Sequence, residues 1–77
     1  MSLKQCTLDR LSIGMVGVVE RLTAGGAERC RMQDLGIVPG AQIKALHKSP
    51  AGDPTAYCIM GAVIAIRNAD AAKIIIT

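Results

Sequence analysis

The chain has 77 residues, enough for a single small domain over residues 1–77, and half of them are apolar although Tyr57 is the only aromatic side chain. Nine Lys and Arg against six Asp and Glu give a net charge of +3, which is dispersed along the sequence without the basic stripe that nucleic-acid binding usually needs. The scarcity of aromatic rings also excludes base-stacking platforms for nucleic acid and ring-lined grooves for proline-rich peptides.

Turn residues divide the chain into short apolar segments. Glycine, proline and asparagine separate these segments. Between the turns, β-branched residues are frequent and several segments alternate, which is typical of strands. We predict five strands, over residues 15–22, 41–48, 55–60, 62–67 and 73–77.

One helix is predicted between the first and second of these strands, over residues 27–35, because this segment consists of good helix formers. Gly36 is expected to adopt the left-handed cap conformation, with Ile37 folding back on the last turn. Helical spacing places Leu35 on the face that closes the core, near Met32, and leaves Cys30 on a flank or in solvent. A short second helix is predicted to begin at Asn68, with the Asn68 side chain as its cap.

Short antiparallel strands with one helical insertion favour a small closed or nearly closed all-β barrel, because a parallel sheet would need a long crossover for every strand pair. We predict a two-residue turn at 61–62, which would pair Met60 with Val63 and Ile59 with Ile64. The predicted core is Val19, Ile43, Tyr57, Ile59, Ile64, Ile66, Ile74 and Ile76.

The outward face of this hairpin would carry Ala56, Cys58, Met60, Val63, Ala65 and Arg67, which is more apolar than an outward face usually is. A contiguous apolar surface on so small a domain usually marks a contact surface. We therefore expect a partner-binding surface of Cys58, Met60, Val63 and Ala65, with Arg67 at its rim. The alternative is that the helix or a terminal segment covers this face.

Three motifs occur in a characteristic order: D-L-G-I-V-P-G at 34–40, S-P-A-G-D-P at 49–54 and G-A-V-I-A-I-R at 61–67. Together they resemble the FeoA family over residues 8–76, although Met32 stands where the family usually has Leu. The resemblance implies an SH3-like barrel with a helix between its first two strands. It also implies a cytosolic accessory protein of the FeoB ferrous-iron transporter, with Asp53 as a further candidate for partner contact. Turn chemistry alone would also explain Asp53.

Metal binding has weak candidates in Cys30, Cys58 and His47. Thiol and imidazole ligands suit Zn²⁺ or Cu(I) better than Fe²⁺, and none of these residues lies at ligand spacing. His47 shares the parity of Ile43 and Ala45, so we expect it to be half-buried. The cysteines lie outside the three motifs, so the resemblance assigns them no role, and we expect no cofactor.

Three cysteines without a CxxC pair favour free thiols and a reducing compartment. Apolar runs of about six residues are too short to span a membrane, and no leader sequence precedes them. We therefore expect a cytoplasmic protein that is not an enzyme, because the sequence has no recognisable catalytic arrangement. Its expected function is docking on a FeoB-like transporter. The alternative is a self-associating or metal-buffering protein that uses its cysteines and its apolar face.

Overall fold

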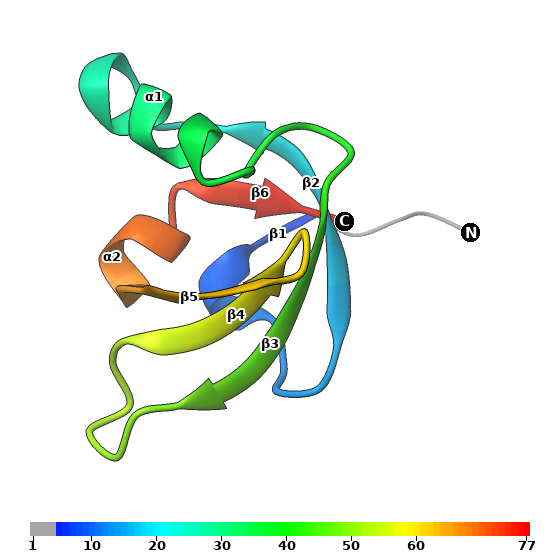
Figure 1. Ribbon diagram of the computed structural model, residues 1–77, viewed down its shortest axis with the longest axis vertical. Helices are drawn as coiled ribbons and strands as arrows, with labels where there is room; N and C mark the ends of the chain where they lie inside the picture. The colour runs from blue at the N-terminus through cyan, green and yellow to red at the C-terminus, as the bar shows by residue number, and fades with distance from the viewer. Residues whose placement is uncertain (1–4) are drawn as a thin grey trace.

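The computed structural model describes residues 5–77, which form an antiparallel sheet and two α-helices (Figure 1). The five predicted strands and the predicted helix are confirmed, with bounds within one residue of those expected. The elements are β1 (Cys6–Thr7), a 3₁₀ turn (Leu8–Arg10), β2 (Val16–Leu22), α1 (Gly26–Asp34), β3 (Gln42–Lys48), β4 (Thr55–Ile59), β5 (Ala62–Ile66), α2 (Asn68–Ala71) and β6 (Ile74–Ile76). The additional strand, β1, is too short to give a sequence pattern, and because of it α1 follows the second strand rather than the first.

The sheet has the strand order β1-β6-β2-β3-β4-β5, and all its pairs are antiparallel. Figure 1 shows the sheet curling into a barrel, with α1 beside it and α2 between β5 and β6. Two irregularities in register, one in β2 opposite β6 and one in β3 opposite β4, help to bend the sheet. Within residues 5–77, neither helix has the length and apolarity to cross a membrane.

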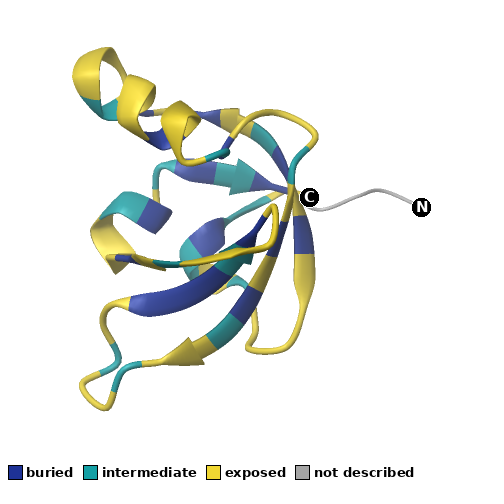
Figure 2. Ribbon diagram, viewed as in Figure 1, coloured by how far each residue is buried: buried dark blue, intermediate teal, exposed yellow. Residues whose placement is uncertain are grey.

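The core lies between the inner faces of these strands (Figure 2). The predicted core residues are buried, except that Ile64 is half-buried and packs against the others. Leu8, which was not among the predicted core residues, is fully buried. The Tyr57 hydroxyl donates a hydrogen bond of 3.4 Å to the Leu8 carbonyl oxygen. Burial raises the pKa of Tyr57 above its ordinary value of 10.0.

The predicted end of α1 is confirmed. Gly36 has φ +94°, the Gly36 N–H donates to the Gln33 carbonyl, and the Ile37 N–H donates to the Met32 carbonyl at 3.1 Å. This hydrogen-bond pattern is the Schellman motif, in which a left-handed residue lets the chain fold back over the last turn. Ile37 is thereby buried in the core.

The prediction that Leu35 closes the barrel is wrong. Leu35 is 42% exposed, and Met32 is the only buried residue of α1. Leu35 still has helical dihedrals, and its N–H donates to the Arg31 carbonyl, but α1 meets the barrel core through Met32 alone, so the neighbouring Leu35 stays at the surface. Figure 2 shows α1 almost entirely exposed, in agreement with the prediction for Cys30.

The hairpin register also differs from the prediction, while the faces are as expected except at Ala56, which was expected to be exposed on the outward face and is buried. Ile59 pairs with Ala62 and Cys58 with Val63, so the two-residue turn is Met60-Gly61. Both turn residues have positive φ, 51° for Met60 and 82° for Gly61, as a hairpin turn of this length requires. The slip along β5 is two residues, which preserves the side of the sheet on which each residue lies.

Two further local predictions are wrong. His47 is exposed rather than half-buried, because the irregularity between Ala45 and His47 breaks the alternation of β3. The Asn68 side chain does not cap α2. Instead, Asp53 Oδ1 accepts a hydrogen bond of 2.9 Å from the Asn68 N–H, and Asn68 Nδ2 donates to the Gly52 carbonyl. The β3–β4 loop therefore holds the beginning of α2.

Candidate interaction surface

Strand pairing places one row of outward-facing side chains across four strands. Val16 on β2 pairs with Lys44 on β3, Lys44 pairs with Cys58 on β4, and Cys58 pairs with Val63 on β5. Directly paired residues lie within side-chain contact on one face of a sheet. The row is therefore continuous, and Lys44 is its only charged residue.

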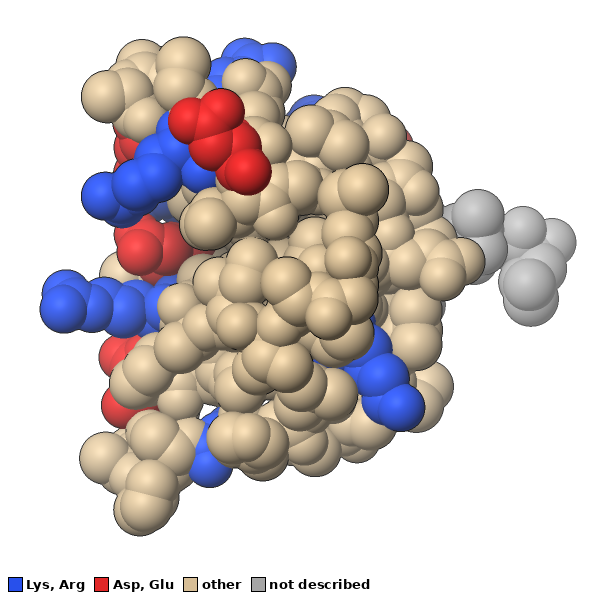
Figure 3. Space-filling view, in the orientation of Figure 1, with Lys and Arg blue, Asp and Glu red and all other residues tan. Residues whose placement is uncertain are grey.

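Met60 extends this row at the β4–β5 turn. It is 78% exposed, Val63 is 67% exposed and Val16 is 53% exposed, which is unusual for side chains of this size. A shallow hollow beside them is lined by Val16, Gln42, Lys44, Cys58, Met60 and Gly61. We call Val16, Val18, Cys58, Met60, Val63 and Ala65 the outer patch. In Figure 3 the face over β3 to β5 is mostly uncharged.

The outer patch contains four of the predicted partner-binding residues. Met60, Val63 and Ala65 are exposed, and Cys58 is half-buried between Lys44 and Val63. The contribution of β2 was not predicted: Val16 and Val18 are exposed there, while Val19 is buried. The alternation of the strand could have revealed it, since Val16 and Val18 lie on the opposite side of β2 from the buried Val19.

The two charged members of the predicted surface lie toward α2, and Arg67 lines the same opening as Ala65 of the outer patch. Arg67 follows β5 and is exposed. Asp53 is in the β3–β4 loop, and one of its oxygens is engaged by the Asn68 N–H. Both flank the beginning of α2, and Figure 3 shows charged side chains gathered along the side of the molecule where α1 and α2 lie.

The metal-ligand candidates do not converge. Cys30 is on α1, His47 on β3 and Cys58 on β4, and all three thiols of the chain are free. Among residues 5–77 there is no group of three or more His, Cys, Asp and Glu side chains that could hold a metal ion.

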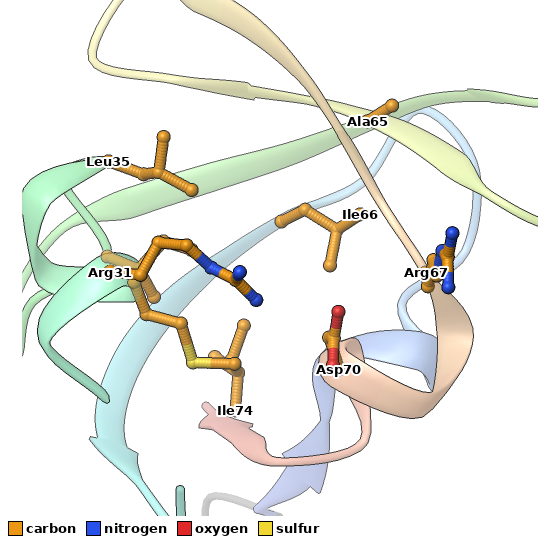
Figure 4. A pocket seen from close by; sticks show the side chains of 9 residues that line it. Arg31, Leu35, Ala65, Ile66, Arg67, Asp70 and Ile74 are labelled. Atoms are coloured by element: carbon orange, nitrogen blue, oxygen red, sulfur yellow. The ribbon is translucent and has the colours of Figure 1, made fainter. Parts of the chain in front are cut away.

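A second concave feature lies where the barrel is open between β5 and β6, beneath α1. This opening has a volume of about 440 Å³, and its lining comprises Arg31, Met32, Leu35, Ile37, Ala65, Ile66, Arg67, Asp70 and Ile74. In Figure 4 the Arg31 guanidinium extends from α1 across the opening, toward the side on which Asp70 lies. The floor is apolar and the rim is charged.

One ion pair ties α1 to the segment between α2 and β6. Lys73 Nζ lies 2.9 Å from Glu28 Oε1 and 3.0 Å from Oε2. The hydrogen bonds from Lys73 lower the pKa of Glu28 below its ordinary value of 4.5. Within residues 5–77 this is the only ion pair, so neither Arg31 nor Arg67 has a carboxylate within salt-bridge distance there.

Comparison with known proteins identifies the family. The model of the FeoA domain family matches residues 6–77. The Fe(2+) transport protein A/Fe(2+) transporter FeoB fusion protein of Porphyromonas gingivalis is 36% identical over 67 residues, which are 87% of this chain and 8% of that protein. This chain therefore spans less than a tenth of that relative's length.

Solved structures share the fold. The FeoA-like protein from Clostridium acetobutylicum is 28% identical with a TM-score of 0.88, over 99% of this chain and 88% of that one. Stenotrophomonas maltophilia FeoA complexed with zinc, described as a procaryotic SH3 domain protein, is 27% identical with a TM-score of 0.81, over 92% of this chain and 88% of that one. The fold is thus an SH3-like barrel, and because the family model spans residues 6–77, the chain belongs to the FeoA domain family.

Proposed function

We propose that this protein is a non-enzymatic accessory of ferrous-iron transport, which acts in the cytoplasm by docking on a FeoB-type transporter. The observation that carries this proposal is the Porphyromonas gingivalis protein, in which a segment similar to most of this chain is part of the same polypeptide as a transporter FeoB. Covalent linkage of two domains raises their effective concentration for each other, which favours a pair that works in contact.

The outer patch is the surface that we assign to this docking. Its exposed Met60 and Val63 would gain free energy by leaving water, at roughly 25 cal/mol for each Å² of apolar area buried. The thioether of Met60 can adapt its shape to an irregular partner. Arg67 would contribute at the rim, and Asp53 would act mainly by holding the β3–β4 loop against α2.

The placement of chemical groups supports a binding role over the alternatives. A single amine, Lys44, lies between Val16 and Cys58 of the outer patch, among apolar side chains, which suits association rather than acid–base chemistry. Self-association through the same patch is the competing possibility. Metal buffering has less support, because Cys30 and Cys58 lie on separate elements and no described metal-binding cluster includes them.

The test is a titration of this protein with the cytosolic part of the FeoB-type transporter from the same organism, followed by isothermal calorimetry. We expect the unmodified protein to bind, and we expect Met60→Asp and Val63→Asp each to weaken binding by about tenfold or more, which is about 1.4 kcal/mol. Ile13→Asp is the matched control, because Ile13 is 46% exposed but belongs to the loop before β2 and not to the outer patch.

Circular dichroism of each variant checks that the fold is retained. The proposal is wrong if the unmodified protein does not bind, or if both patch variants bind as tightly as Ile13→Asp. Sedimentation of the protein alone separates the alternative. If the apparent mass of the unmodified protein rises with concentration, while Met60→Asp and Val63→Asp stay at the monomer mass, the outer patch is assigned to self-association.

A further inference from the structure

The opening between β5 and α1 has properties that the outer patch lacks. Its floor consists of Met32, Ile37, Ile66 and Ile74, whose side chains belong to the core. Its volume of about 440 Å³ lies within the range of about 300 to 1,000 Å³ that is typical of ligand sites. An apolar side chain entering here would meet the barrel core directly.

One wall of the opening is formed by the end of β5, which is an edge strand of the sheet. β5 pairs with β4 and, among residues 5–77, with no other strand, so its second edge is free. In an antiparallel pair, alternate residues direct their N–H and C=O groups away from the partner strand. Because the Met60-Gly61 turn closes on the Ile59–Ala62 pair, these residues are Val63 and Ala65.

The free edge lacks the charged residues and the proline that usually protect an edge strand. β5 contains no charged residue and no proline, and all five of its residues are apolar. Proteins usually block an exposed edge with a lysine, a proline or a covering element. Ala65, the second residue with outward backbone groups, is itself part of the lining of the opening.

The rim of the opening supplies charge. Arg31 reaches across it from α1, Arg67 lies at the end of β5, and Asp70 lies between them on α2 (Figure 4). The three side chains sum to one positive charge. Neither arginine has a salt bridge within the described residues, whereas Lys73, which lies nearby in the chain, is already paired with Glu28.

We propose that this opening binds an extended peptide segment that adds to the free edge of β5. The segment pairs its backbone with Val63 and Ala65, places an apolar side chain over Ile66 and Ile74, and places a carboxylate against Arg31. Side chains two positions apart in a strand lie on the same side, about 7 Å apart. The recognised pattern is therefore an apolar residue and an acidic residue separated by one position.

This site shares Val63 and Ala65 with the outer patch, but it uses their backbone groups together with the opening beneath α1, and it does not depend on docking to the transporter. Backbone pairing would provide affinity, while the apolar opening and Arg31 would provide selectivity, as in other cases of strand addition. A second copy of this chain pairing along β5 is the other conceivable occupant. It is disfavoured because β5 carries no carboxylate for Arg31.

The test uses an acetylated, amidated heptapeptide of threonine with leucine at its third position and glutamate at its fifth. ¹⁵N-labelled full-length protein is titrated with this probe to millimolar concentration. We expect saturable shifts of the Val63 and Ala65 amide signals. Replacing the peptide glutamate with lysine should weaken binding by about tenfold, which is about 1.4 kcal/mol.

Two controls separate strand addition from other binding. Two peptides are made, one N-methylated at its odd-numbered residues and the other at its even-numbered residues. Only one of them should lose binding, because alternate residues of a strand direct their N–H groups to the same edge and only one edge pairs with β5. Arg31→Glu should favour the lysine peptide over the glutamate peptide. Arg29→Glu should not, since Arg29 is exposed on the same helix but is not part of the lining.

Four results would overturn the proposal. They are no shift at millimolar probe, equal loss of binding with both N-methylated peptides, unchanged preference of Arg31→Glu, or shifts of Val63 and Ala65 that follow protein concentration without any peptide. The last result would assign the edge to a second copy of the chain.

Discussion

The inner and outer faces of the β4–β5 hairpin are both apolar, but their surroundings are opposite. On the inner face, Tyr57 and Ile59 are fully buried. On the outer face, Val63 and the turn residue Met60 are among the most exposed apolar side chains of the described chain. The comparison teaches that apolar composition alone does not identify the core of this protein. One face supplies stability, and we assign the other to recognition.

The largest expected effect breaks the inner face. Ile59→Ala should lower the free energy of unfolding by about 2 to 5 kcal/mol, because it leaves a cavity among residues that cannot fully collapse into it. Val63→Ala, on the adjacent strand but on the outer face, should change it by no more than about 0.5 kcal/mol. Urea unfolding at neutral pH measures both. Equal losses would show that the outer face is packed, in contradiction to its exposure.

The hairpin also shows what the sequence could predict. Alternation assigned Tyr57, Ile59 and Ile66 to the inner face correctly, because strand parity is a property of each segment alone. Register was not predictable, since it depends on a turn that places Met60 at φ 51°, a conformation that residues other than glycine rarely adopt.

The remaining errors have related causes. His47 is exposed because a bulge opposite Ala56 breaks the parity of β3, and bulges have no reliable sequence signal. Asp53 reaches Asn68 across 15 positions of the chain, so no local pattern of capping could reveal the contact. The outer patch was predicted only where it lies on β4 and β5. The opening beneath α1 was missed, because it joins residues from α1, α2, β5 and β6.

Gly36 lies where the end of α1 meets Met60, and changing it should have an effect of intermediate size on the free energy of unfolding. A Cβ at Gly36 would lie 2.9 Å from the Met60 sulfur, and Gly36 has φ +94°. Gly36→Ala should therefore destabilise the protein by about 1 to 3 kcal/mol, mostly from backbone strain. Gly25→Ala is the control, since Gly25 has no atoms within 4 Å of such a Cβ and an ordinary negative φ. Thermal unfolding that ranks the two variants in reverse would contradict the conformation of Gly36.

A smaller effect separates stability from recognition at one residue. Met60→Gly relieves the positive φ of Met60, and we expect the free energy of unfolding to change by less than about 1 kcal/mol, in the stabilising direction. The same change removes the most exposed side chain of the outer patch, so binding to the transporter should weaken. Denaturation and calorimetry on one preparation check both. A variant that is destabilised yet binds normally would contradict the division between the two faces.

The smallest expected effect lies outside the hairpin. The lowered pKa of Glu28 means that the folded protein favours the carboxylate, so the contribution of its pairing with Lys73 is present above the unfolded pKa and is lost as the pH falls through the folded value. Stability relative to Lys73→Met should therefore decline below about pH 4.5. Both side chains are partly exposed, so the decline should be slight and should vanish in high salt. A difference that grows as the pH falls would contradict the pairing.

The central claim is that the outer patch is the docking surface, and methyl cross-saturation tests it without changing any side chain. The complex of this protein with the cytosolic part of the transporter is prepared, the transporter protons are irradiated, and the methyl signals of the deuterated, methyl-labelled protein are recorded. Our account predicts that Met60, Val63 and Val16 lose intensity while Ile13 and Ile59 keep theirs. Loss at Ile13, with Met60 and Val63 unaffected, would contradict it.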